Sequence, residues 1–239
     1  MGRCLPLKLC VGHYTKLWHT LTMLNMDFRQ AVIIDTDTEA WVASPAPGVW
    51  RKPLAREERE RGHATSMVRF DPGARFAQHG HPQGEEILVL EGTFSDEYGD
   101  YPAGAYIRNP SGFKHTSFSD QGCTLFVKLH QFQPDDRQQI HIDTHNTPWM
   151  PGLGQLRIMP LHEFKAEHTA LVHWPAGYEP ASGKGWGGEE IVVLSGELRS
   201  HDKRYGVGCW LRGPSLGKDL RKVEEDTVIW LKTGHLAPL

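Results

Sequence analysis

The chain has 239 residues and a formal net charge of −3 at pH 7, which gives no electrostatic case for binding nucleic acid or an anionic membrane. No apolar run is long enough to span a bilayer. The four cysteines, at positions 4, 10, 123 and 209, are widely separated, as is typical of reduced thiols rather than of a disulfide framework. We therefore expect a cytoplasmic globular protein with no nucleic-acid or membrane partner.

Residues 1–25 show no pattern that continues into the rest of the chain. A short alternation of apolar residues is interrupted by Lys8, His13 and Lys16, so it does not form a signal-peptide core. We expect residues 1–25 to be disordered or to be an extension upstream of the natural start, with Met26 as an alternative first residue.

From residue 26 onward, short apolar segments alternate with turn residues, and helical periodicity is scarce. Turn signals such as Asp71-Pro72-Gly73 and Asn109-Pro110-Ser111-Gly112 separate the segments. The expected strands of the first half are 31–34, 40–42, 49–55, 65–70, 75–78, 86–91, 92–95, 105–108 and 124–129. This spacing predicts an all-β fold, in particular a jelly roll whose two sheets close into a cup.

Four side chains that can bind a metal lie near one of these strands: His79, His81, Glu85 and His115. Positions 79, 81 and 85 share parity, so their side chains can point the same way along an extended chain. The Pro82-Gln83-Gly84 break can redirect Glu85, so parity leaves its direction open. The neighbouring Glu86 has the opposite parity and is expected to point away. Three imidazoles and one carboxylate together predict a site for a divalent metal ion.

The second half of the chain repeats the first at an offset of 104 residues. The turn glycines coincide, and Gly84–Ile87 aligns with Gly188–Ile191. A repeat of this length indicates duplication of a whole domain. Among the candidate ligands only Glu85 keeps its type, because the four equivalent positions are Gly183, Gly185, Glu189 and Asp219. We therefore expect one metal ion per chain.

These patterns divide the chain into four parts. After residues 1–25 we expect a first cup at 26–135, which holds the metal site. A polar connector follows at 136–160. The second cup, at 161–239, is expected to keep the scaffold without a metal site.

The spacing of the candidate ligands resembles the two motif blocks of the cupin superfamily. The first reads Gly73-x5-His79-x-His81-x3-Glu85-x6-Gly92, and the second reads Gly104-x5-Pro110-x-Gly112-x2-His115. Only the final Asn of the second block is missing, since Ser119 stands in its place. The stretches 84–97, 99–104 and 122–128 also resemble the cupin domain of ChrR-type anti-sigma factors. The resemblance is strongest over 50–133 and implies a bicupin, a pair of double-stranded β-helix barrels.

The resemblance implies two kinds of function. ChrR-type cupins imply zinc and a regulatory, ligand-sensing role, whereas the β-diketone-cleaving dioxygenases among small cupins imply iron and catalysis. The sigma-binding domain of the ChrR family carries a His-x3-Cys-x2-Cys zinc motif, and the spacing of Cys4 and Cys10 does not match it. We therefore expect a small-molecule metalloenzyme, dioxygenase- or hydrolase-like, that uses zinc or iron, with manganese or nickel as alternatives. A non-catalytic metal-dependent sensor is the other hypothesis, and assembly into a homodimer is left open.

Overall fold

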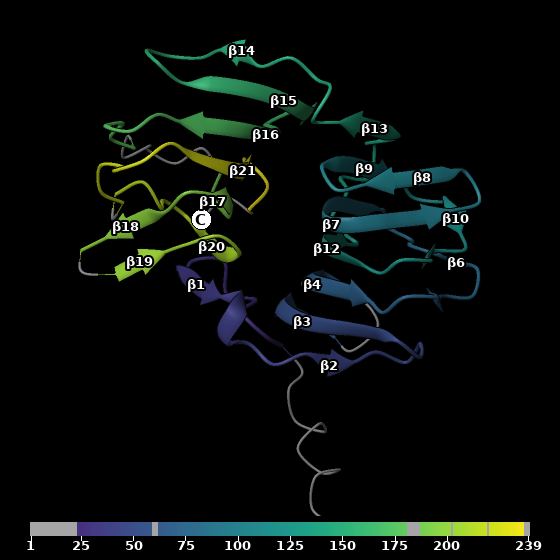
Figure 1. Ribbon diagram of the computed structural model, residues 1–239. Helices are drawn as coiled ribbons and strands as arrows, with labels where there is room; N and C mark the ends of the chain where they lie inside the picture. Colours follow the sequence, from purple (N-terminus) through teal and green to yellow (C-terminus); the bar gives the residue numbers. More distant parts are fainter. Residues whose placement is uncertain (1–22, 59–61, 181–186, 202, 219, 237–239) are drawn as a thin grey trace, which may run out of the picture.

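The computed structural model describes residues 23–58, 62–180, 187–201, 203–218 and 220–236. Within these ranges all regular structure is β-sheet except one 3-10 turn, η2 (Thr36–Thr38). No helix there is long and apolar enough to cross a membrane. The predicted all-β class is confirmed, and Figure 1 shows two barrels side by side.

The first barrel is built on a sheet with the strand order β13-β9-β7-β12-β4-β3-β2. Its strands are β2 (Val42–Ala43), β3 (Val49–Arg56), β4 (Ala64–Phe70), β7 (Glu85–Asp96), β9 (Ala105–Asn109), β12 (Cys123–Leu129) and β13 (Ile140–Asp143). Short paired strands complete the barrel: β5 (Ala74–Arg75), β6 (His79–Gly80), β8 (Gly99–Pro102), β10 (Lys114–His115) and β11 (Phe118–Ser119).

The second barrel repeats this order strand for strand, as β1-β20-β17-β21-β16-β15-β14. The duplication predicted from the sequence is therefore present in the fold. The strands are β1 (Val32–Asp35), β14 (Met150–Pro151), β15 (Arg157–Phe164), β16 (Glu167–Trp174), β17 (Glu189–Ser195), β18 (Leu198–Ser200), β19 (Lys203–Tyr205), β20 (Cys209–Gly213) and β21 (Thr227–Thr233).

Each barrel is completed by a strand from the other half of the sequence. Strand β1 pairs with β20 of the second barrel, with Val32 opposite Arg212. Strand β13, which lies in the expected connector 136–160, pairs with β9 of the first barrel, with Ile140 opposite Arg108. In Figure 1 the purple segment runs from β1 on one barrel to β2 on the other. Neither half therefore contains its complete sheet alone.

The end of the expected N-terminal extension also touches the fold. Leu24 forms a β-bridge with Arg56, and Asn25 donates from its side chain to the carbonyl of Leu54 at 2.7 Å. Residues 1–22, the remainder of that extension, lie outside the described residues.

Alternation along the strands divides the apolar side chains among three cores. On β7, Ile87 and Val89 face the interior of the first barrel, whereas Leu88 faces the layer between the two barrels. A third cluster fills the second barrel. Because Glu86 shares the parity of Leu88, its carboxylate points into the layer between the barrels and away from the first cup.

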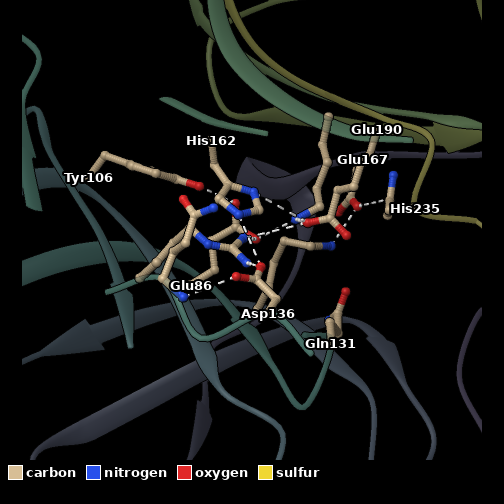
Figure 2. Close-up of polar contacts among 12 residues, drawn as sticks. Glu86, Tyr106, Gln131, Asp136, His162, Glu167, Glu190 and His235 are labelled. Atoms are coloured by element: carbon tan, nitrogen blue, oxygen red, sulfur yellow. Dashed lines mark hydrogen bonds and ion pairs between the residues drawn. The ribbon is translucent and has the colours of Figure 1, made fainter. Parts of the chain in front are cut away.

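Buried charges cross this layer in a pattern related by the repeat. Lys232 Nζ lies 2.6 Å from Glu86 Oε2, and Lys128 Nζ lies 2.5 Å from Glu190 Oε2, with all four side chains at most 4% exposed. Figure 2 shows Glu86, Glu167 and Glu190 converging there. Such charges are tolerated in a protein interior only because each has a partner.

Acid is expected to destabilise the protein through this network. Burial alone would raise the pKa of Glu86, but Lys232, Arg108 and Lys128 outweigh it and lower the pKa from 4.5 to about 2. The unfolded chain therefore binds a proton that the folded chain does not bind, and stability is lost as pH falls from about 4.5 to about 2. Urea unfolding midpoints measured from pH 7 to pH 3 check this, and a midpoint that stays constant below pH 4.5 would contradict it.

Candidate metal centre

Two of the predicted ligands are brought together by strand pairing. His79 on β6 lies directly opposite His115 on β10, and their ring centroids are 4.9 Å apart. His81 follows two residues after His79, with its ring 4.9 Å from that of His79. One ring nitrogen from each of the three histidines lies within 4.8 Å of the others. Three imidazoles gathered this closely could hold one metal ion.

Glu85 reaches the same point from the start of β7. Its Oε1 lies 3.3 Å from His81 Nε2 and its Oε2 lies 3.5 Å from His115 Nε2. The side chain is buried, and Asn109 Nδ2 donates to Oε2 at 3.4 Å. All four residues singled out in the sequence therefore lie together in the first barrel.

A glycine turn sets the direction of Glu85. The N–H of Gly84 donates to the carbonyl of His81 at 3.0 Å, which folds the chain back between the two ligands. Gly84 has φ of +76°, and a Cβ there would lie 2.5 Å from the Phe132 ring. Only glycine fits both the backbone conformation and the contact.

The rings of His79 and His115 are each oriented by a hydrogen bond at Nδ1, which directs the opposite nitrogen, Nε2, toward the cluster. Nδ1 of His79 lies 2.9 Å from the carbonyl of Ala77, and Nδ1 of His115 lies 3.2 Å from Asp96 Oδ2. The Nε2 atoms of His81 and His115 are buried without a hydrogen-bond partner. Buried polar atoms are normally satisfied, so these orphaned nitrogens fit ligands of a metal ion.

The electrostatic surroundings differ between the histidines. Burial lowers the pKa of His81 below its usual value, despite the nearby Glu85 carboxylate. Burial also acts on His115, but the hydrogen bond to Asp96 and the charge of Glu85 outweigh it and raise the pKa. A metal ion must displace any proton on His115, because only the neutral imidazole is a ligand.

The equivalent region of the second barrel uses its carboxylate differently. Glu189, which corresponds to Glu85, accepts hydrogen bonds from the backbone N–H groups of Leu216 at 2.6 Å and Gly217 at 3.3 Å. Its carboxylate therefore holds a loop. Gly183, Gly185 and Asp219 lie outside the described residues.

A cavity of about 530 Å³ opens onto the site, and His79, His81 and Glu85 form part of its wall. The rest of the wall is mainly apolar. It includes Val68, Phe70, Phe76, Ile87, Phe94, Leu125, Val127 and Leu129. Polar groups from Arg51, Arg56, Gln83 and His130 also line it. A small organic molecule with one oxygenated end matches this arrangement of polar and apolar groups.

Sequence reasoning missed Asp96, Asn109 and His130. Asp96 and Asn109 lie at the ends of β7 and β9, and only the strand pairing brings them near the ligands. His130 directly follows β12, whose last residue, Leu129, is paired with Glu85. Its ring lies 5.8 Å from that of His81, and its φ of +60° is unusual for a residue other than glycine.

Asp96→Asn is expected to weaken metal binding by about 10–100-fold, the range typical of removing a carboxylate that orients a ligating histidine. Asp96 is itself held by the N–H of Tyr98 at 2.9 Å and the hydroxyl of Tyr101 at 3.3 Å. Competition titration with a chromophoric zinc chelator measures the loss. Asp120→Asn, which changes an exposed carboxylate paired with Arg75, is the matched control. Equal affinities of the two variants would contradict the role of Asp96.

Comparison with known protein families assigns the chain to one of them. The model of the ChrR cupin-like domain matches twice, over residues 29–133 and 137–237. Among curated proteins, none matches the chain.

Solved structures share the fold at low sequence identity. A provisionally assigned dioxygenase from Nostoc punctiforme is 17% identical, with a TM-score of 0.69 over 88% of this chain and 85% of that one. Pirin YhhW from Escherichia coli, solved with nickel(II), is 12% identical, with a TM-score of 0.61 over 88% and 100%. A mutant of Bacillus subtilis oxalate decarboxylase is 13% identical, with a TM-score of 0.56 over 87% and 78%. At these identities the likeness shows the fold alone.

The two matches of the family model fall on the two halves of the repeat, and together they span most of the chain. The predicted resemblance is therefore confirmed: this chain belongs to the ChrR cupin-like domain family and is a bicupin.

Proposed function

We propose that this protein is a metalloenzyme that acts on a small organic molecule inside the first cup. The observation that supports the proposal best is the position of the 530 Å³ cavity, whose wall includes His79 and His81 of the histidine cluster together with Glu85. A purely structural metal needs no such access. We infer one metal ion per chain, held by His79, His81, Glu85 and His115.

The chain's own residues have distinct roles in this proposal. A bound divalent metal would supply Lewis-acid or electron-transfer chemistry. Asp96 and Ala77 fix the ring orientations of His115 and His79, so that the ligand set is formed before substrate enters. The apolar wall around Phe94 and Ile87 excludes water, which strengthens electrostatic interactions within the cup. Glu85 serves as a ligand rather than as a base.

We propose zinc or iron as the metal, with manganese or nickel as alternatives. Three imidazoles and a carboxylate form a borderline donor set that accepts all four ions. Among proteins of similar fold, pirin YhhW was solved with nickel(II), and Bacillus subtilis oxalate decarboxylase has Mn(II) centres. Those metals belong to those proteins, and elemental analysis decides the matter here.

A metal-dependent sensor is the second candidate, and the family match to a ChrR cupin-like domain favours it. The same cup would then bind a small molecule without converting it. Both functions need the metal, so they differ only in turnover.

Elemental analysis of protein purified without added metal, followed by a screen of small oxygenated substrates under air and under nitrogen, tests the proposal. We expect one equivalent of metal per chain and turnover that chelation abolishes and metal restores. Bound metal with ligand binding but no turnover would favour the sensor. Two equivalents, with one lost in Glu189→Ala, would refute the asymmetry between the cups.

A further inference from the structure

A second cavity, of about 880 Å³, lies between the two barrels and is separate from the first cup. Both halves of the repeat line it, with Trp41, Leu88 and Leu90 on one side and Trp149, Val192 and Leu194 on the other. Val207, which is 58% exposed, lies at its edge. Its wall is thus formed largely by paired apolar and indole groups.

One buried cation faces this cavity without a matching anion. Lys52 on β3 is only 7% exposed and lines the cavity wall. Its Nζ donates to the carbonyl of Thr36 at 2.6 Å and lies 4.6 Å from the centre of the Trp41 ring. Among the residues that the structure describes, no carboxylate lies within 4.0 Å of it. An ammonium group has three donors, so Lys52 has unused hydrogen-bonding capacity as well as an unpaired charge.

The repeat shows that the fold does not require a charge at this position. Lys52 lies opposite Met67 in the β3–β4 pair, and the equivalent pair in the second barrel is Met159 opposite Leu171. Met159 is 1% exposed. A methionine therefore fills the same place in the other half, so packing at this position does not call for a buried charge.

A second cation lies against the same indole ring. The guanidinium carbon of Arg69 is 4.8 Å from the centre of the Trp41 ring. Arg69 Nε is 3.7 Å from Asp71 Oδ1, and this nitrogen is buried without a hydrogen bond. Asp37 and Glu91 also line the cavity, and neither forms an ion pair with Lys52 within 4.0 Å in the described part of the chain. Lys52 is therefore the lining cation for which the structure shows no carboxylate partner among the described residues, whereas Arg69 is paired with Asp71.

From these contacts we propose that the cavity between the barrels binds a small organic anion with an aromatic body. Its carboxylate pairs with Lys52, and its ring lies against Trp41 and the leucines of the wall. A charge-assisted hydrogen bond in a largely desolvated place is strong, and indole and leucine surfaces are typical of aromatic-ligand pockets. The site stands independently of the metal in the first cup.

Calorimetric titration of the full chain, as purified, with naphthalene-1-acetate tests the proposal. Naphthalene-1-acetamide, the uncharged analogue, is the matched ligand control. We expect the carboxylate to bind at least about tenfold more tightly than the amide, and Lys52→Met to remove that preference. Met159 indicates that methionine is tolerated in this packing position.

A second pair of variants keeps the test decisive if Lys52→Met folds poorly. Val207 is exposed at the edge of the cavity, so Val207→Glu and Val207→Lys both place a long polar side chain there and differ from each other mainly in the sign of its charge. Val207→Glu is expected to weaken binding of the carboxylate, and Val207→Lys is expected to preserve it. Absence of binding to the wild type, equal affinities of the two Val207 variants, or a carboxylate preference that survives in Lys52→Met would overturn the proposal.

Discussion

Replacing His81 with alanine is expected to empty the metal site of the first cup and to abolish any turnover. His81 supplies a buried Nε2 that has no hydrogen-bond partner and lies 3.3 Å from Glu85 Oε1. Its loss removes one imidazole from the set of three, so affinity should fall by more than the roughly 10–100-fold typical of losing an outer-shell partner.

Metal content measured by elemental analysis, together with zinc affinity from chelator competition, checks this expectation. His168→Ala is the matched control, because its side chain is 52% exposed and lies in the second half of the chain. The control should bind metal as the wild type does. A His81→Ala protein that still holds one equivalent with wild-type affinity would show that these residues are not the ligands, and activity retained without metal would exclude metal-centred chemistry.

The ligands were accessible to sequence reasoning because local spacing encodes most of their positions. His79 and His81 lie on one extended segment, where alternation alone aligns their side chains. The direction of Glu85 was not predictable, since it depends on how the turn at Gly84 packs against Phe132. That contact joins residues 48 positions apart in the sequence, and periodicity contains no information about it.

Contacts between the two halves of the chain could not be predicted from the sequence, for a different reason. The exchange of β1 and β13 between the sheets leaves no signature in either strand, because an edge strand has the same apolar alternation on whichever barrel it joins. The alternation of side chains along the strand correctly predicted that Glu86 points away from the cup. It could not show that Glu86 meets Lys232, which lies 146 positions along the chain. The charged residues at this interface therefore looked like ordinary polar strand positions.

The largest expected effect on stability comes from breaking one of the lysine–glutamate pairs buried between the two barrels. Lys128→Met is expected to destabilise the fold by about 3–5 kcal/mol, because it leaves the carboxylate of Glu190 buried without its lysine. Lys128 is 1% exposed, and its Nζ lies 2.5 Å from Glu190 Oε2 and 3.3 Å from Thr65 Oγ1. A loss of this size is a large part of the total stability of a typical domain. Urea unfolding at pH 7 measures it.

The control and the double variant separate the charge from the packing. Lys165→Met makes the same substitution at a lysine whose side chain is 58% exposed, and it should cost no more than about 1 kcal/mol. Lys128→Met combined with Glu190→Gln should be more stable than Lys128→Met alone, because the neutral amide can still accept from Trp210 Nε1 and face His235. A double variant whose loss equals the sum of the two single losses would mean that the two charges are not coupled across the barrels. Recovery in the double variant would instead show that pairing between Lys128 and Glu190 is what makes these buried charges tolerable in the layer between the barrels.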